Sequence, residues 1–125
     1  MRFFSHFQSM QGGLNPGGGG SDFSTGAWEP PLDIYEQREA YTIVVELPGF
    51  DKTQLEVELE GEVLTISGDR AKTVPQGTLH VHQMEIPYGR FTRRVRLPRG
   101  IDPDRIQAEY KDGYLLVEVP RSQTR

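Results

Sequence analysis

Histidine is the residue type in this sequence that is best suited to acid–base or metal chemistry, and the chain has three: His6, His80 and His82. His80 and His82 are two positions apart, so on a β-strand both would project from one face and could bind a metal ion with a nearby carboxylate. The chain has no cysteine and no His-Glu-x-x-His motif to support such a site. Because paired histidines in a polar segment are more often solvated, we expect no metal site and no cofactor.

Nucleophilic catalysis would require a serine or threonine beside a base that a third group holds in place. Ser5 and Ser9 lie close to His6, but all three belong to a segment that we expect to be mobile, so no preorganised oxyanion site is expected there. The glycine run at 17–20 follows no strand and precedes no Gly-Lys-Ser/Thr motif, which argues against a phosphate-binding loop. The alternating glutamates of residues 55–60 are typical of an edge kept soluble. We therefore predict a protein without catalytic activity.

Arg93 is the charged residue whose position is most informative. It shares the strand parity of Phe91 and Val95, so it should point toward the apolar side, whereas its neighbour Arg94 points away. Leaving one partner of a buried ion pair unpaired costs on the order of 3–5 kcal/mol. We therefore expect a carboxylate or several carbonyls around Arg93, from this chain or from a second subunit. The alternative is an exposed strand end at which the side chain reaches water.

The sequence from Pro31 onward alternates apolar and polar residues, which is the pattern of half-buried antiparallel strands. Six segments show this alternation: 41–47, 55–59, 64–66, 91–97, 106–110 and 115–119. Two-residue turns, Gly61-Glu62 and Asp112-Gly113, separate neighbouring segments, and Asp-Gly tolerates the positive φ angles of a type I′ hairpin. No long helical periodicity is present. We predict an all-β fold, an immunoglobulin-like antiparallel β-sandwich of six or more short strands.

The segment 71–88 is a connection too long for a simple hairpin. It contains the strand-like piece HVHQMEI, in which His80, His82, Met84 and Ile86 share one face. An isolated strand cannot satisfy its own backbone, so it needs another sheet edge, which could belong to a second subunit.

Residues 1–31 differ from the rest because glycine dominates them, and glycine loses more backbone entropy on ordering than other residues. We expect a mobile arm. Its aromatic and apolar side chains are many for a plain linker: Phe3, Phe4, Phe7, Met10, Leu14, Phe23 and Trp28. Either the arm is a poorly ordered tail with a few adhesive residues, or it uses these side chains on partners or on other subunits.

Composition restricts the partners and the compartment. The net charge is −4, with 14 basic and 18 acidic residues interspersed, so no broad cationic surface is available for nucleic acid or an anionic membrane. The absence of cysteine suits a reducing cytosol. The start of the chain does not have the pattern of a signal peptide, and nowhere is there a run of about 18 apolar residues. We expect a soluble, cytoplasmic protein.

The block 31–120 resembles the α-crystallin domain of the bacterial and plant type of small heat-shock proteins. The resemblance rests on four segments in order, PPLDIYEQ, VVELPGFDKTQLEVELEGEVLTISGDR, HQMEIPYGRFTRRVRLP and AEYKDGYLLVEVPR. The family signature A-x-x-x-N-G-V-L is present in the last segment, with Asp for Asn and Tyr for Val, as Ala108, Asp112, Gly113, Tyr114 and Leu115.

The resemblance implies a sandwich of about eight strands and a homodimer in which a strand of the long loop is exchanged. Residues 80–85 would pair with residues 32–35 of the other chain, and the family's interface arginine falls on Arg93. The implied dimer interface comprises Leu32, Ile34, Tyr35, His80, His82, Met84, Glu85 and Arg93. The implied groove between two strand edges comprises Leu55, Val57, Leu59, Ile106, Ala108 and Tyr110. The client-binding residues would be Phe3, Phe4, Phe7, Leu14, Phe23 and Trp28.

The resemblance divides the chain into an arm (1–31), an α-crystallin domain (32–121) and a short tail (122–125). The tail lacks the Ile-x-Ile motif with which the family builds large oligomers, which leaves assembly beyond the dimer open. Ile86 and Pro87 stand where the family commonly has an acidic residue and an arginine, so one expected ion pair is missing.

The function that we predict is ATP-independent chaperoning: exposed apolar surface binds partly unfolded proteins and prevents their aggregation. Three alternatives stay open at the level of sequence. One is a module related to the CS-domain cochaperones, which lack the exchanged strand. Another is a metal-binding or hydrolytic enzyme that uses His80 and His82. The last is an assembly partner whose free groove receives the tail of a second small heat-shock protein.

Overall fold

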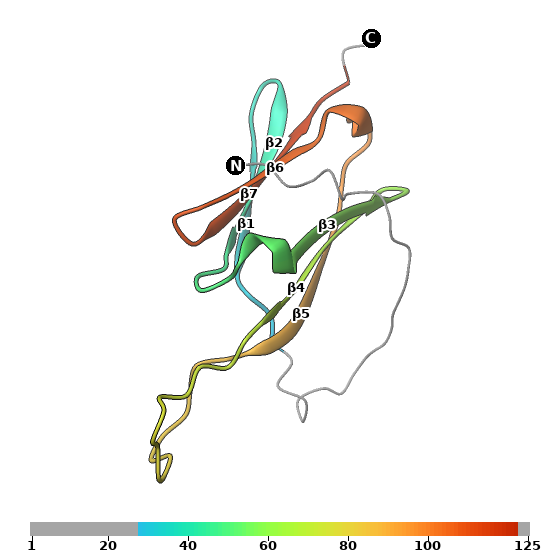
Figure 1. Ribbon diagram of the computed structural model, residues 1–125. Coiled ribbons are helices and arrows are strands. Elements are labelled where there is room, and N and C mark those ends of the chain that lie inside the picture. The colour runs from blue at the N-terminus through green and yellow to red at the C-terminus, as the bar shows by residue number, and fades with distance from the viewer. Residues whose placement is uncertain (1–27, 123–125) are drawn as a thin grey trace.

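The computed structural model describes residues 28–122, which form two antiparallel β-sheets with a shared core (Figure 1). One sheet has the strand order β1-β2-β7-β6 and contains β1 (Leu32–Glu36), β2 (Ala40–Glu46), β6 (Gln107–Lys111) and β7 (Tyr114–Pro120). The other has the order β3-β4-β5 and contains β3 (Leu55–Glu60), β4 (Val63–Arg70) and β5 (Gly89–Arg96). The predicted all-β sandwich is confirmed.

The helical content of residues 28–122 is limited to two single turns of 3-10 helix, η3 (Lys52–Gln54) and η4 (Pro103–Arg105). Asp51 and Asp102 cap them, because each aspartate side chain accepts a hydrogen bond from a backbone N–H two residues on. Neither helix is long or apolar enough to span a membrane.

The core lies between the two sheets and is built from the inward residues of the alternating segments. On β2 and β7, Ile43, Val45, Leu115 and Val117 are completely buried. They meet buried side chains of the other sheet: Leu55, Val57, Leu64, Ile66, Phe91 and Val95. The intervening residues face outward, so the alternation in the sequence predicts these faces correctly.

The Asp112-Gly113 turn has the geometry that its sequence predicts. Asp112 has φ 56° and Gly113 has φ 85°, and these two residues join Lys111 to Tyr114, which are opposite each other in the ladder. Positive φ at both central residues is the mark of a type I′ turn, whose twist suits the flanking strands. The turn therefore fixes the register of β6 against β7.

The loop 71–88 extends beyond both sheets from the ends of β4 and β5 (Figure 1). It contains no strand, so the strand-like piece HVHQMEI is irregular in the single chain. Its apolar side chains are solvent-exposed, with Leu79 87% and Ile86 77% accessible. The physical reason is that no sheet edge among the described residues is paired with it, and an extended segment needs such an edge to become a strand.

Two residues of the segment predicted as an arm pack against the sandwich. Pro30 is buried, and Trp28 forms a parallel bridge with Phe91 and packs against the core. The glycine-rich composition predicts an arm as far as residue 31, but the aromatic ring of Trp28 finds apolar contacts on the sandwich. The sequence-predicted residues Phe3, Phe4, Phe7, Leu14 and Phe23 lie outside the described residues.

Candidate protein-binding surfaces

Arg93 lies on β5 with the inward parity that the sequence predicts. It is half-buried, between the buried Phe91 and Val95, and its Nη1 donates a hydrogen bond of 2.7 Å to the carbonyl oxygen of Pro30. The guanidinium therefore has a backbone carbonyl as a partner within its own chain. This bond fixes the chain just before β1, the strand whose outer edge is a candidate dimer surface.

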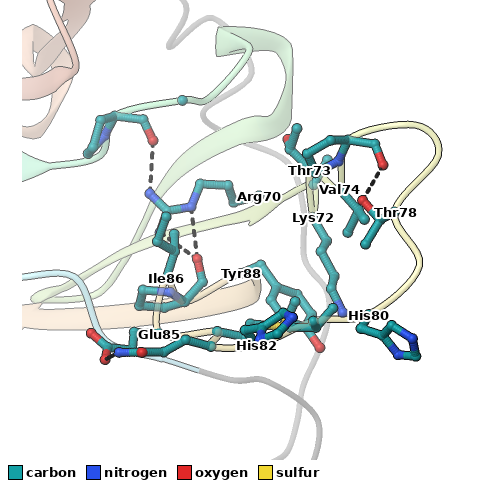
Figure 2. A pocket seen from close by; sticks show the side chains of 18 residues that line it. Arg70, Lys72, Thr73, Val74, Thr78, His80, His82, Glu85, Ile86 and Tyr88 are labelled. Atoms are coloured by element: carbon teal, nitrogen blue, oxygen red, sulfur yellow. Dashed lines mark hydrogen bonds between the residues drawn. The ribbon is translucent and has the colours of Figure 1, made fainter.

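Arg70 is a second inward-pointing arginine, at the end of β4. Its Nη1 donates to the Pro48 carbonyl at 2.9 Å, while its Nε (3.1 Å) and Nη2 both donate to the Pro87 carbonyl (Figure 2). Its guanidinium also stacks over the ring of Trp28, 4.3 Å from the ring centroid. The sequence analysis missed this residue, although Arg70 has the same strand parity as the buried Ile66 and Gly68.

Trp28 completes an aromatic group at this end of the sandwich. Its ring centroid lies 5.6 Å from that of Phe91 and 6.3 Å from that of Phe50, and its indole Nε1 donates to the Gly89 carbonyl at 3.1 Å. Trp28 is half-buried in these contacts. The structure therefore places Trp28 on the domain rather than in a free arm, and its predicted contact with client proteins stays a prediction.

A cavity of about 850 Å³ lies between the two limbs of the loop 71–88. Figure 2 shows Arg70 at its inner end and His80 at its outer rim, pointing away from Arg70. Lys72 lies over the ring of Tyr88, 4.7 Å from the centroid, which joins the two limbs near their base. The predicted interface residues His80, His82, Met84 and Glu85 are all exposed along the cavity.

The paired histidines are the candidate metal ligands that the sequence offers. Within residues 28–122, no group of three or more His, Asp or Glu side chains is arranged to hold a metal ion. Glu85, the carboxylate closest in sequence to His82, accepts a hydrogen bond from Gln83 Nε2 at 2.5 Å.

The second half of the predicted dimer interface is β1, the edge strand of the four-stranded sheet. It pairs with β2 on one side, and no strand of residues 28–122 occupies its other side. Ile34 and Tyr35 are 51% and 52% exposed, while Leu32 is half-buried against the core. Tyr35 Oη donates to the Asp33 carboxylate at 3.0 Å, and this hydrogen bond, together with the negative charge of Asp33, raises the pKa of Tyr35.

The predicted groove residues lie on β3 and at β6, the edge strands of the two sheets. Four of the six are buried in the common core: Leu55, Val57, Ile106 and Ala108. Leu59 and Tyr110 are partly buried beside it, and Tyr110 Oη donates to the Leu47 carbonyl at 2.6 Å. The structure thus brings the six residues together around the core, and their role as a receptor groove stays a prediction.

The sequence that forms these surfaces matches a known protein family. The model of the Hsp20/alpha crystallin family matches residues 33–125. The chain belongs to this family. The sequence of this small heat-shock protein is also 38% identical over 95 residues to that of the 18.1 kDa class I heat shock protein of Oryza sativa subsp. japonica. That match covers 75% of this chain and 59% of the rice protein, so the chain spans less than two thirds of its relative's length.

Solved structures of the family have the same fold. A small heat-shock protein from Xylella fastidiosa, described as having a distinct high order structure, matches with a TM-score of 0.72 and 33% identity. The hspA protein from Xanthomonas axonopodis matches with a TM-score of 0.71 and 33% identity. The matches cover 78% of this chain in both cases, and 90% and 98% of the respective structures. The membership and the sandwich predicted from the sequence are therefore confirmed.

Proposed function

We propose that this small heat-shock protein is an ATP-independent chaperone that binds partly unfolded proteins and prevents their aggregation. The proposal rests on one observation: the sandwich has a complete core, yet its long loop exposes several apolar side chains. Five apolar side chains of the loop are between 44% and 87% exposed: Val74, Leu79, Val81, Met84 and Ile86. Family membership supports the same function.

We further propose that the chain forms a homodimer by strand exchange. Residues 80–85 of one chain would pair with β1 of the other, and a two-fold axis would repeat the contact, as in most homodimers. Two features of residues 28–122 support this: no strand among them pairs with the outer edge of β1, and the loop carries backbone that belongs to no ladder. Met84 and Ile34 would then lose solvent exposure, and burying a side chain of this size is worth about 1.5–3 kcal/mol.

Client capture would follow from apolar contact, at roughly 25 cal/mol per Å² of buried apolar area. The proposed contacts on the arm are the predicted residues Phe3, Phe4, Phe7, Leu14 and Phe23. The groove between β3 and β6 is a second candidate contact, and larger oligomers are a further part of the proposal. We place the activity in the cytoplasm, where a chain without cysteine has no disulfide to lose by reduction.

The test is a client aggregation assay by light scattering, without nucleotide. The full chain should suppress the heat-induced scattering of a model client at a stoichiometric ratio. A variant with Leu79→Ser and Ile86→Ser changes two side chains with little packing in the single chain, so its monomer should fold normally while its protection of the client falls. Leu116→Ser, a 37% exposed residue on β7, is the matched control. Wild-type protein that leaves the scattering unchanged would contradict the proposal.

A further inference from the structure

Arg70 occupies the point at which the chain leaves the sandwich for the loop. It is the last residue of β4 and is opposite Gly89, the first residue of β5, so Arg70 and Gly89 form the final pair of that ladder. Beyond this pair the two limbs have no ladder to hold them together. The side chain of Arg70 continues the connection, because its Nε and Nη2 both reach the Pro87 carbonyl.

Two backbone carbonyls at this junction accept hydrogen bonds from Arg70. The Pro87 carbonyl lies outside the β4–β5 ladder, which ends at the Arg70–Gly89 pair, so the Arg70 side chain supplies its donor. The Pro48 carbonyl, at the turn after β2, accepts the third hydrogen bond of Arg70. A guanidinium can do this because it presents five N–H donors in a fixed plane. Arg70 thus ties both ends of the loop to the turn between β2 and η3.

The same guanidinium also contacts Trp28, the first residue that the structure describes. Trp28 covers it by stacking, and the indole N–H donates to Gly89, two residues after the carbonyl that Arg70 binds. The base of the loop and the attachment of the N-terminal segment therefore share one set of contacts. Losing the ring would remove the apolar cover from one face of the guanidinium, and losing the guanidinium would remove one support of the ring.

We propose that Arg70 is a positioning residue that couples the direction of the loop 71–88 to the docking of Trp28. The inference rests on the proposed strand exchange, since the loop direction matters only if residues 80–85 must reach a partner's β1. Coupling of this kind is reciprocal: dimerisation strengthens the docking of Trp28, and release of Trp28 weakens the dimer by the same factor. Arg70 thereby links the proposed dimer contact to the docking of Trp28, one of the residues predicted to bind clients.

Arg70→Lys in the full chain tests the coupling, because lysine keeps the charge but loses the planar, multidentate donor set. Two quantities are measured: the dimer dissociation constant by analytical ultracentrifugation, and the acrylamide quenching of Trp28, which is the single tryptophan of the chain. We expect the dissociation constant to rise about tenfold and the quenching of Trp28 to increase. Arg96→Lys is the matched control, since Arg96 is on β5, is exposed and binds Glu62; it should change neither quantity.

Trp28→Ala provides an independent variant at the periphery of the core. It should also weaken the dimer, and combining it with Arg70→Lys should weaken the dimer by less than the product of the two single effects. A merely structural role would lower thermal stability without this non-additivity. If the wild-type chain is a dimer and the Arg70→Lys variant has the same dissociation constant, the coupling alone is overturned. A wild-type chain that is monomeric throughout would overturn the strand exchange and the coupling together.

Discussion

Replacing Gly68 with alanine would place a methyl group where the three-stranded sheet has no room. Gly68 is on the central strand β4, opposite Leu55 on β3 and Phe91 on β5. A Cβ atom at this position would lie 2.8 Å from Leu55 Cδ2, 2.9 Å from the Gln54 carbonyl oxygen and 2.9 Å from Phe91 Cε2. The carbonyl belongs to the backbone and the other two atoms to buried side chains, so none can move freely.

The cost follows from the packing of the core. Adding a methylene to a well-packed core typically costs about 1–3 kcal/mol. Gly68→Ala should reach the upper part of this range, because three atoms must shift at once. For a domain of this size the melting temperature falls by about 4–8 °C for each kcal/mol, so the expected decrease is roughly 10–20 °C.

Differential scanning calorimetry measures this decrease directly. Ser67→Ala is the matched control, because Ser67 is adjacent on β4 but has the opposite strand parity; its effect should stay within about 0.5 kcal/mol. A melting temperature for Gly68→Ala equal to that of Ser67→Ala would refute the argument from close contacts, and with it the packing of β3 against β5 across Gly68.

Two further changes probe the rim of the sandwich and its edge. Tyr110→Phe removes the hydroxyl that donates to Leu47 and accepts from the Phe50 N–H, so urea unfolding should show a loss of about 1–3 kcal/mol; no loss would mean that water replaces the hydroxyl. Burial, with the charges of Glu60 and Glu56, raises the pKa of Glu58, so the folded state binds this proton more tightly than the unfolded state does. Stability therefore falls as the pH rises from the unfolded pKa of roughly 4 through the folded pKa. In urea titrations, Glu58→Gln should raise the free energy of unfolding by about a few tenths of a kcal/mol at pH 7. Below a pH of about 4 it should have no effect. A gain that is largest in acid would contradict this sign.

The parts of the fold that local patterns determine were predictable from the sequence. Alternation placed Val57, Ile66 and Val117 in the core, and the Asp112-Gly113 pair predicted its turn. The strand order β1-β2-β7-β6 was not predictable in this way, because β2 and β7 are far apart in the sequence and the pattern within a strand does not name its partner.

The candidate site was predictable only in part. Strand parity identified Arg93, and the same argument applied to Arg70 would have found the second arginine. The sequence predicts Trp28 as part of the arm because the glycine-rich composition describes the whole segment, whereas the docking of one aromatic ring depends on the surface that Phe50 and Phe91 offer it. The sequence predicts that HVHQMEI needs another sheet edge, but the conformation of the loop in the single chain depends on a pairing edge that residues 28–122 do not supply.

The central claim is that the chain keeps unfolding proteins soluble without nucleotide, and the mass of the native protein by light scattering tests it most directly. The measurement is made at two temperatures, with and without a heat-sensitive client. We predict a dimer or a larger assembly that forms soluble complexes with the client on heating in the absence of ATP. A monomer that binds no client, and beside which the client aggregates as it does alone, would contradict the account.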